Sequence, residues 1–256
     1  MRIIFCGYRK WSHQIFRDVL DNIEQFFKYN EDIENINIPI VVTSKGKQEV
    51  NFSDLDVPVV ELRNETEDLY DVIYEYKPDA MFLVGWSWRV SEEVLNATKC
   101  FCIHPSPLPT YKGGSPLQNQ IIAGEKNSAV TLFKMTSGLD DGPIMQQKEI
   151  SLEGTLNDIF KRVIEVGTEQ IITTIRLLPS WSEGYLTEQV GKGTVCKRRK
   201  PKDSEITGKE MTESSAEYLY NKIRCVAPND YAEYPVAYFV CADGKKIYFG
   251  ETWINE

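Results

Sequence analysis

The sequence predicts an α/β protein: a Rossmann-like, mostly parallel β-sheet with helices on both faces, followed by a small C-terminal α+β appendix. Apolar runs of strand length alternate with segments of helical period as far as residue 178, and such alternation is typical of β-α-β units. After residue 190 the sequence becomes basic and rich in breaker residues. We therefore expect a main domain at residues 1–190 and a small C-terminal domain, with a helix and a β-hairpin, at residues 191–256.

The N-terminal part of the chain repeats the pattern of strand and helix. Each expected strand is a short apolar run, and the expected helices show helical spacing or begin at a capping residue. Ile15, Val19 and Ile23 share one face of the first helix. Asn64 and Ser91 are candidate capping residues at the starts of the next two expected helices. The expected strands are residues 2–7, 38–44, 57–62, 80–85 and 100–104. The expected helices are residues 12–29, 64–77 and 91–98.

In the rest of the main domain, the sequence pattern predicts a helix, a strand and a long helix. The helix over residues 115–124 ends at Gly124, a residue type that favours the backbone of a helix end. Residues 129–136 alternate in the manner of a strand. The helix over residues 155–178 begins at the capping Thr155. The elements expected in the appendix are a helix over residues 215–226 and a hairpin over residues 236–250 that turns at Asp243 and Gly244.

Charge and hydropathy exclude several classes of protein. The chain has 29 basic and 38 acidic residues, a net charge of -9, so repulsion opposes broad binding of nucleic acid. No apolar run approaches the roughly 20 residues that span a bilayer, and the N-terminus lacks the apolar region of a signal peptide. We therefore expect a cytoplasmic protein with neither a nucleic-acid nor a membrane partner.

The cysteines predict neither a disulfide framework nor a metal site. The chain has 6 cysteines, most of them in apolar runs, where a thiol behaves as a small hydrophobic side chain. Cys100 and Cys102 form a C-x-C pair without a second pair or a histidine at metal-binding spacing. We expect reduced structural thiols and no bound metal.

His104 stands where a chemical role is favoured, although a lone histidine at a strand end is more often structural. Residues 105–109, Pro-Ser-Pro-Leu-Pro, cannot extend a strand or a helix. The chain must therefore turn away and leave His104 at the carboxyl end of the sheet, where ligands bind in such folds. Gly113 and Gly114 would then let the backbone approach a ligand closely.

Two carboxylates follow in a tight loop flanked by glycines. Asp140 and Asp141 come directly after the strand at residues 129–136, which we expect beside the strand that ends at His104. An aspartate beside a histidine orients the ring and favours its charged form, as a general base or an electrostatic stabiliser requires. Taken alone, the Asp-Asp-Gly segment would be a simple turn.

These segments together carry a family resemblance. Residues 102–145, CIHPSPLPTYKGGSPLQNQIIAGEKNSAVTLFKMTSGLDDGPIM, resemble the core signature of the folate-dependent formyltransferases. That family includes methionyl-tRNA formyltransferase, glycinamide ribonucleotide transformylase and the nucleotide-sugar N-formyltransferases. The segments FLVGWSWRV (residues 82–90) and CKRRKPKDSEI (residues 196–206) extend the similarity over most of the chain.

The resemblance implies a direct transfer of a formyl group from 10-formyltetrahydrofolate, a cosubstrate, to a primary amine without a metal. His104 would take the proton of the amine or stabilise the oxyanion, and Asp140 would hold the ring. Asp140 rather than Asp141 matches the family, because the family's aspartate follows Gly-Leu, here Gly138 and Leu139. The resemblance also places the pterin of the donor at the cofactor-binding residues Trp86, Ser87, Trp88, Leu139, Asp141 and Gly142.

Cys102 departs from the family pattern, which has an asparagine two residues before the histidine. A thiol is a much weaker donor than an amide, and loss of one oxyanion donor costs about a hundredfold to a thousandfold in rate. A backbone N–H group, a water, Gln118 or Asn119 could replace it. We still expect an active enzyme, with Cys102 counted among the catalytic residues, because the rest of the constellation is intact.

The acceptor is expected to be a nucleotide-linked amino sugar, dTDP or UDP. Tyr8 or Trp11 would stack on the base, or would pack in the core instead, and Arg9 would meet a phosphate or a carboxylate. The basic segment CKRRKPK would be a solvated linker or would contact the diphosphate. The expected substrate-binding residues are Tyr8, Arg9, Trp11, Lys112, Gly113, Gly114 and Gln118.

The resulting hypothesis is a cytoplasmic nucleotide-sugar N-formyltransferase. One alternative is an enzyme like methionyl-tRNA formyltransferase, disfavoured because residues 191–256 are few for a tRNA-binding domain. A second alternative is a catalytically impaired protein that binds folate or a nucleotide sugar, because Cys102 replaces the expected asparagine. The resemblance suggests a homodimer, in which the hairpin at residues 236–250 would lie at the interface or pack on its own domain.

Overall fold

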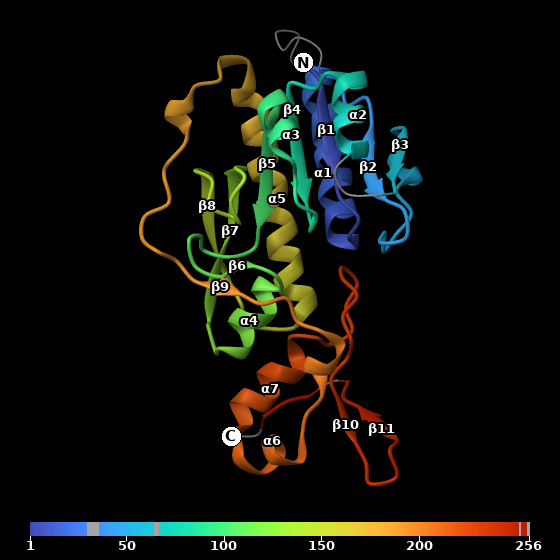
Figure 1. Ribbon diagram of the computed structural model, residues 1–256, viewed down its shortest axis with the longest axis vertical. Coiled ribbons are helices and arrows are strands. Elements are labelled where there is room, and N and C mark those ends of the chain that lie inside the picture. Colours follow the sequence, from blue (N-terminus) through green and yellow to red (C-terminus); the bar gives the residue numbers. More distant parts are fainter. Residues whose placement is uncertain (30–35, 64–66, 251, 255–256) are drawn as a thin grey trace.

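The computed structural model describes residues 1–29, 36–63, 67–250 and 252–254. Its main sheet consists of β1 (Ile3–Cys6), β2 (Val41–Ser44), β3 (Val59–Leu62), β4 (Ala80–Val84), β5 (Lys99–His104), β7 (Asn127–Lys134) and β8 (Ile144–Ser151). The strand order is β3-β2-β1-β4-β5-β7-β8 (Figure 1). The first five strands are mutually parallel, whereas β7 is antiparallel to β5 and β8 is antiparallel to β7. The predicted mostly parallel sheet is therefore confirmed.

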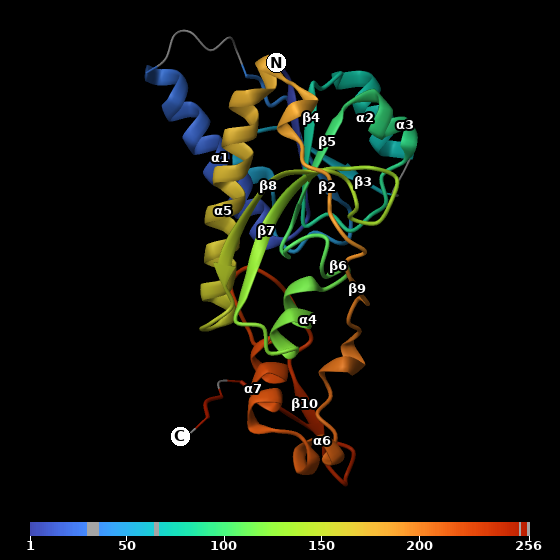
Figure 2. The same cartoon turned by 90° about the vertical axis from the view of Figure 1, so that its left-hand side faces the viewer.

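Helices cover both faces of this sheet, as predicted (Figure 2). The helices around the sheet are α1 (Lys10–Tyr29), α2 (Glu67–Tyr76), α3 (Glu92–Ala97), α4 (Pro116–Ile122) and α5 (Leu156–Leu177). Ile15 of α1 and Val163 of α5 pack with Phe82 of β4 in one fully buried apolar cluster. Leu83, the next residue of β4, belongs to a second cluster on the opposite face with Val94 of α3. Alternate residues of each strand thus bury themselves under different helices.

Capping side chains and a glycine stand at the ends of several helices. Ser91 accepts a hydrogen bond from the backbone N–H of Val94 at the start of α3. Thr155 and Asp158 form a reciprocal capping box at the start of α5. Gly124 follows α4 with a φ of +83°, in the left-handed region that favours glycine. The predicted cap at Asn64 lies outside the described residues.

The strand β8 was missed, and β7 has an orientation that matters for the site. Most of the side chains of β8 are polar or partly exposed, because this strand lies at the edge of the sheet. Strand β7 lies beside β5, as predicted, with Thr131 opposite His104 and Lys134 opposite Phe101. Because the two strands are antiparallel, the loop that leaves β7 must return along the sheet to reach His104.

The C-terminal part consists of short elements below the sheet (Figure 1). They are β9 (Val195–Cys196), α6 (Gly208–Glu213), α7 (Ala216–Arg224), β10 (Tyr238–Val240) and β11 (Lys246–Tyr248). Short 3-10 helices lie at Ser53–Leu55, Leu178–Ser180, Glu183–Tyr185 and Pro201–Ser204. Strands β10 and β11 form the predicted hairpin around Gly244, whose φ is +80°. Strand β9 pairs in parallel with β6 (Lys112–Gly113). The domain boundary near residue 190 stays a prediction.

The helices in the described part of the chain include none that is long and apolar enough to cross a membrane. The described residues also contain no group of three or more His, Cys, Asp or Glu side chains arranged to hold a metal ion.

Candidate active site

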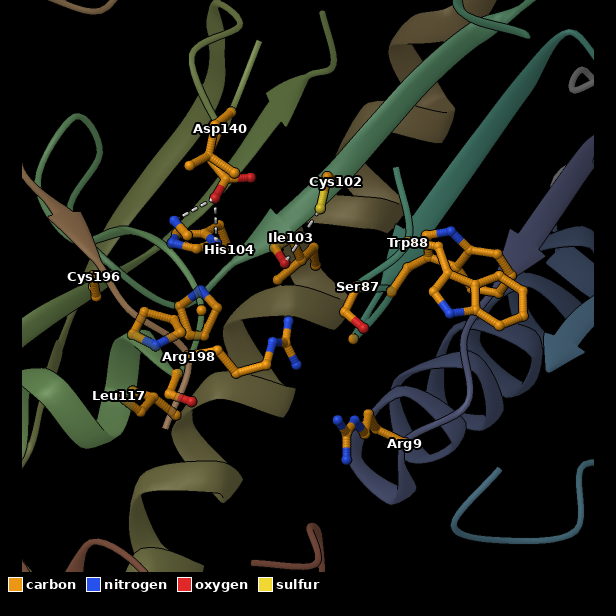
Figure 3. A pocket seen from close by; sticks show the side chains of 18 of the residues that line it. Arg9, Ser87, Trp88, Cys102, Ile103, His104, Leu117, Asp140, Cys196 and Arg198 are labelled. Carbon is orange, nitrogen blue, oxygen red and sulfur yellow. Dashed lines mark hydrogen bonds and ion pairs between the residues drawn. The ribbon is translucent and has the colours of Figure 1, made fainter. Parts of the chain in front are cut away.

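A cavity of about 680 Å³ lies beside the carboxyl ends of β4 and β5, where the sequence predicted a site. It draws residues from both ends of the chain, including Arg9 and Arg198 (Figure 3). The predicted site residues that line it are Arg9, Trp11, Trp86, Ser87, Trp88, Cys102, His104, Gly113, Gly114, Gln118, Leu139 and Asp140. A cavity of this size can hold a small-molecule ligand.

His104 and Asp140 meet in this cavity (Figure 3). His104 is buried, and its Nε2 donates a hydrogen bond to the carbonyl oxygen of Tyr111 at 2.9 Å. Its Nδ1 lies 3.6 Å from Asp140 Oδ2. The same Asp140 oxygen accepts a hydrogen bond from the backbone N–H of Gly113 at 2.7 Å. The ring orientation is therefore fixed on one side by a carbonyl, and a carboxylate stands beside the ring to stabilise positive charge on it.

Cys102 lies on the same strand as His104 and is buried at the cavity wall. Its sulfur makes only a weak contact of 3.7 Å with the carbonyl oxygen of Ile103. Burial raises the pKa of Cys102 well above its ordinary value, and the charge of Asp140 raises it further. The side chain is consequently a neutral thiol at pH 7, which is neither a strong donor nor a nucleophile.

The loop that carries Asp140 brings only part of its predicted residues to the cavity. Leu139 lines the cavity and is 56% exposed. Asp141 does not line it, because its carboxylate accepts a hydrogen bond from the Thr136 hydroxyl within the loop. Gly142 is also absent from the lining, since it packs against the carbonyl of Lys134 where a Cβ would clash. In this structure Asp141 and Gly142 close the loop, and their contact with a bound donor stays a prediction.

Tryptophans form one side of the cavity. The rings of Trp86 and Trp88 lie edge to face with centroids 5.0 Å apart. Both indole Nε1 atoms are buried and find no hydrogen-bond partner in the described part of the chain. An unpaired buried N–H group is costly unless a ligand accepts from it. This side therefore offers flat apolar surface and two free donors.

Tyr8 and Trp11 occupy places that sequence reasoning had left open between stacking and packing. Tyr8 is 1% exposed, its ring packs against Trp86, and its hydroxyl is hydrogen-bonded to Ser87. Tyr8 therefore packs tightly in the structure, but it also lines an adjoining cavity with Arg9 and Trp88, and its stacking on a base stays a prediction. Trp11 is buried beside Phe160 but still reaches the cavity wall.

Gly113 and Gly114 accommodate another part of the chain rather than a ligand. A Cβ on Gly113, whose φ is +92°, would lie 2.7 Å from the carbonyl oxygen of Cys196. A Cβ on Gly114 would lie 2.5 Å from the Cβ of Arg198. Lys112 pairs with the same segment, through β9, and does not line the cavity. Lys112, Gly113 and Gly114 thus hold residues 195–198 against the site, while the two glycines also line the cavity, and their contacts with a ligand stay a prediction.

Two further lining residues bring polar groups to the cavity. Gln118 is 2% exposed, and its amide is in hydrogen-bonding contact with the Tyr234 hydroxyl, which also lines the cavity. Arg198 was not singled out by the sequence, although it belongs to the basic segment CKRRKPK. It also lines an adjoining cavity of about 350 Å³ with Arg9 and Lys47. Figure 3 shows the guanidinium groups of Arg9 and Arg198 extending into the open space, so this entrance is positively charged although Arg9 pairs with Glu49.

Sequence comparison relates the chain to enzymes that transfer formyl groups. The family described as formyl transferase matches residues 28–175. The methionyl-tRNA formyltransferase of Thermosipho africanus is 28% identical over 239 residues, which is 89% of this chain and 73% of that protein. The methionyl-tRNA formyltransferase of Carboxydothermus hydrogenoformans is 29% identical over 266 residues, covering 100% of this chain and 81% of the relative.

Solved structures share the fold. A methionyl-tRNA formyltransferase from Clostridium thermocellum has a TM-score of 0.70 at 24% identity, covering 100% of this chain and 94% of its own. A sugar N-formyltransferase from a Shewanella species has a TM-score of 0.75 at 16% identity, covering 100% and 99%. HypX from Aquifex aeolicus, in complex with tetrahydrofolic acid, has a TM-score of 0.68 at 16% identity, covering 98% of this chain and 37% of that one.

Proposed function

The chain belongs to the formyl transferase family and is thus a one-carbon transfer enzyme, and we propose that it moves a formyl group from 10-formyltetrahydrofolate to the amine of a nucleotide-linked amino sugar. One observation carries this proposal. The His104–Asp140 pair faces a single cavity that has tryptophans on one side and two arginines at its entrance. The first side suits the flat ring system of a folate, and the second suits a diphosphate.

The residues present fit the folate donor. The orphaned indole N–H groups of Trp86 and Trp88 are matched by the nitrogen and oxygen acceptors of a pterin. Ser87 and the exposed Leu139 would complete the contacts. A shared fold with HypX in its complex with tetrahydrofolic acid supports this choice. When bound, the donor supplies an activated formyl carbon.

The formyl transfer requires that negative charge be stabilised and that a proton be removed, and residues around the reacting atoms would do both. Attack by an amine places negative charge on the formyl oxygen and releases a proton from nitrogen. His104, beside the Asp140 carboxylate, would accept the proton or stabilise the oxyanion. Cys102 supplies only a neutral thiol, so we propose Gln118, whose buried amide lines the cavity beside Tyr234, as the replacement donor.

The charges near the cavity favour a small anionic acceptor. Arg9, Lys47 and Arg198 line the smaller cavity at the entrance, and guanidinium groups bind phosphate through paired hydrogen bonds. The net charge of -9 opposes a large polyanion such as tRNA. Structural neighbours include a sugar N-formyltransferase from Shewanella and a 4-N formyltransferase from Francisella tularensis, which also supports a nucleotide sugar.

A second candidate is transfer to methionyl-tRNA. The observation that favours it is the sequence similarity to methionyl-tRNA formyltransferases. This candidate predicts tight binding of tRNA that weakens steeply as salt is raised. Binding of folate or nucleotide sugar without turnover would instead indicate a protein that binds but does not catalyse.

The decisive experiment offers both kinds of acceptor. The protein is incubated with 10-formyltetrahydrofolate and, separately, dTDP- or UDP-linked 3-amino and 4-amino sugars or methionyl-tRNA, and mass spectrometry detects the formylated product. We expect formylated amino sugar. Formylation of methionyl-tRNA alone would transfer the proposal to the second candidate, and no product with any acceptor would contradict both.

We also propose that the enzyme acts in the cytoplasm as a homodimer. Ile247 and Tyr248 of β11 are 57% and 61% exposed, and β11 is paired on one edge only in the described structure. Such an edge is suited to pairing with a second copy. Light scattering on the purified protein should give twice the mass of the chain, and a monomeric mass would contradict the dimer.

A further inference from the structure

Two residues at the catalytic pair have a strained backbone. Asp140 has a φ of 46° and Tyr111 a φ of 58°, in the left-handed region that residues with a Cβ avoid. Asp140 supplies the carboxylate that faces His104, and Tyr111 supplies the carbonyl that accepts from His104 Nε2. Such strain persists only where surrounding contacts hold it in place.

Gln189 holds the first of these residues. Its Nε2 donates hydrogen bonds to the carbonyl oxygens of Asp140 at 2.9 Å and Gly142 at 2.8 Å. Its Oε1 is buried without a partner among the described residues, so the hydrogen bonds of this amide go to the Asp140 loop. Two residues earlier, Thr187 forms a pair of backbone hydrogen bonds with Ile144, at 2.7 and 2.8 Å. Gln189 is thereby anchored to the edge of the sheet.

Thr194 holds the second strained residue. Its hydroxyl accepts a hydrogen bond from the backbone N–H of Tyr111 at 2.8 Å, and its carbonyl accepts from the N–H of Lys112 at 2.8 Å. Its own N–H donates to the carbonyl of Pro109 at 3.2 Å. Strand pairing at Gly113 continues these contacts, and Gly113 donates the hydrogen bond to Asp140.

We infer that Gln189 and Thr194 are positioning residues for the His104–Asp140 pair. Both belong to residues 187–196, which we call the strap and which run past β8 to β9 beside β6 (Figure 1). Neither side chain lines the cavity, so neither touches the substrates. The strap instead holds two backbone segments: residues 140–142, which carry Asp140, and residues 111–113, which accept the hydrogen bond of His104 and donate one to Asp140. This inference rests on the proposed function, because it assumes that the pair performs the formyl transfer.

The test at Gln189 compares a variant that removes the donors with one that restores them. Gln189→Met keeps the length of the side chain without a donor, whereas Gln189→Lys offers an ammonium group to the same carbonyls. We expect Gln189→Met to lower kcat about tenfold to a hundredfold, with KM for donor and acceptor within about twofold, as a small misplacement of catalytic groups does. Gln189→Lys should recover most of the rate. Val190→Ala is the control, because Val190 is 85% exposed.

The test at Thr194 follows the same design. Thr194→Val is close in shape but cannot accept the hydrogen bond of the Tyr111 N–H, whereas Thr194→Ser keeps the acceptor. We expect the valine variant to lower kcat and the serine variant to restore it. Thermal unfolding of all variants is recorded alongside, and Gln189→Met should unfold at the wild-type temperature, since methionine also removes a buried unpaired oxygen.

Nitrogen-15 NMR of the histidine rings provides a readout that needs no substrate. The chain has 2 histidines, so a His13→Gln variant assigns the His104 signals. We expect the His104 signals to shift in Gln189→Met and Thr194→Val and to return in Gln189→Lys and Thr194→Ser. Unchanged kcat and unchanged signals in both Met and Val variants would overturn the inference. The inference would also be overturned if kcat fell equally in Gln189→Met and Gln189→Lys, and equally in Thr194→Val and Thr194→Ser, together with a lower unfolding temperature. That result would indicate a structural role alone. If no acceptor is formylated by the wild type, the NMR result still decides whether the strap positions His104.

Discussion

At the scale of single residues, the proposed reaction depends on His104 and Asp140. The ring is held by the Tyr111 carbonyl and faces the carboxylate at 3.6 Å. Asp140 also accepts from the Gly113 N–H group, so its position does not depend on the histidine. A substitution of His104 or Asp140 should therefore leave the backbone hydrogen bond of the other residue in place.

We predict that His104→Ala and Asp140→Asn each lower kcat by about a hundredfold or more, the usual contribution of positioned acid–base catalysis. Asparagine keeps the size of Asp140 and an oxygen for the Gly113 N–H, but it removes the negative charge that stabilises a charged ring. Steady-state kinetics with the identified acceptor measure both effects. Rates equal to the wild type would remove these residues from the mechanism.

A second prediction concerns Cys102, which stands where the family pattern has an asparagine amide. Cys102→Asn should raise kcat, because an amide N–H group donates far better than a buried thiol. Gln118→Met should lower kcat about tenfold to a hundredfold in the native background and less in the Cys102→Asn background, where a second donor is present. A rate that falls in Cys102→Asn, with unchanged thermal unfolding, would show that the thiol itself is preferred.

At the scale of elements, the sequence predicted those features that have local signals. Apolar runs predicted the strands β1 to β5, and side chains such as Ser91 and Thr155 predicted where helices begin. The edge strand β8 was missed because its side chains are largely polar and exposed. Gly113 shows another limit of local signals: a glycine indicates that something approaches closely, but only the fold shows that Cys196 does so. The contacts of Gln189 and Thr194 join segments far apart in the chain, so no local pattern could reveal them.

One prediction concerns the pairing of α6 with α7. Burial opposes the charged form of Glu210, but hydrogen bonds from Lys222 and Thr207 outweigh it and lower the pKa of Glu210 from 4.5 to about 2. Because the folded-state pKa is depressed, this stabilisation is present above about pH 4.5 and is lost as the pH falls through about 2.

The variant Glu210→Gln should therefore destabilise the protein by about 1–3 kcal/mol at pH 7, the range for hydrogen bonds to charged groups. The difference from the wild type should shrink as the pH falls from 4.5 towards 2. Circular dichroism during thermal unfolding at several pH values measures it. A difference independent of pH would show that the charge of Glu210 contributes nothing.

At the scale of the whole molecule, the sign of the charge differs between the surface and the site. The chain carries a net charge of -9, yet Arg9, Lys47 and Arg198 gather at the cavity entrance. A small anion is attracted locally, whereas a long polyanion meets repulsion elsewhere on the surface. This separation is the main physical reason to prefer a nucleotide sugar over tRNA as the acceptor.

We predict that Arg198→Gln raises KM for the nucleotide-sugar acceptor about tenfold or more, as expected when a charged hydrogen bond to phosphate is lost. The KM for the folate should stay unchanged, because the tryptophan side is untouched. Lys202→Gln, which removes an equal charge from an exposed residue of the same basic region, serves as the control. Equal effects of the two variants would reduce the role of Arg198 to general electrostatics.

The strap also has a consequence for building chimeras. The family match ends at residue 175, yet Gln189 and Thr194 hold the catalytic loops from further along the chain. If the strap positions the catalytic pair, the smallest part of the chain that can carry the activity is longer than the part that the family match covers. An exchange of C-terminal parts between relatives should therefore join the chains after residue 198, so that each sheet keeps the strap with which its loops were matched.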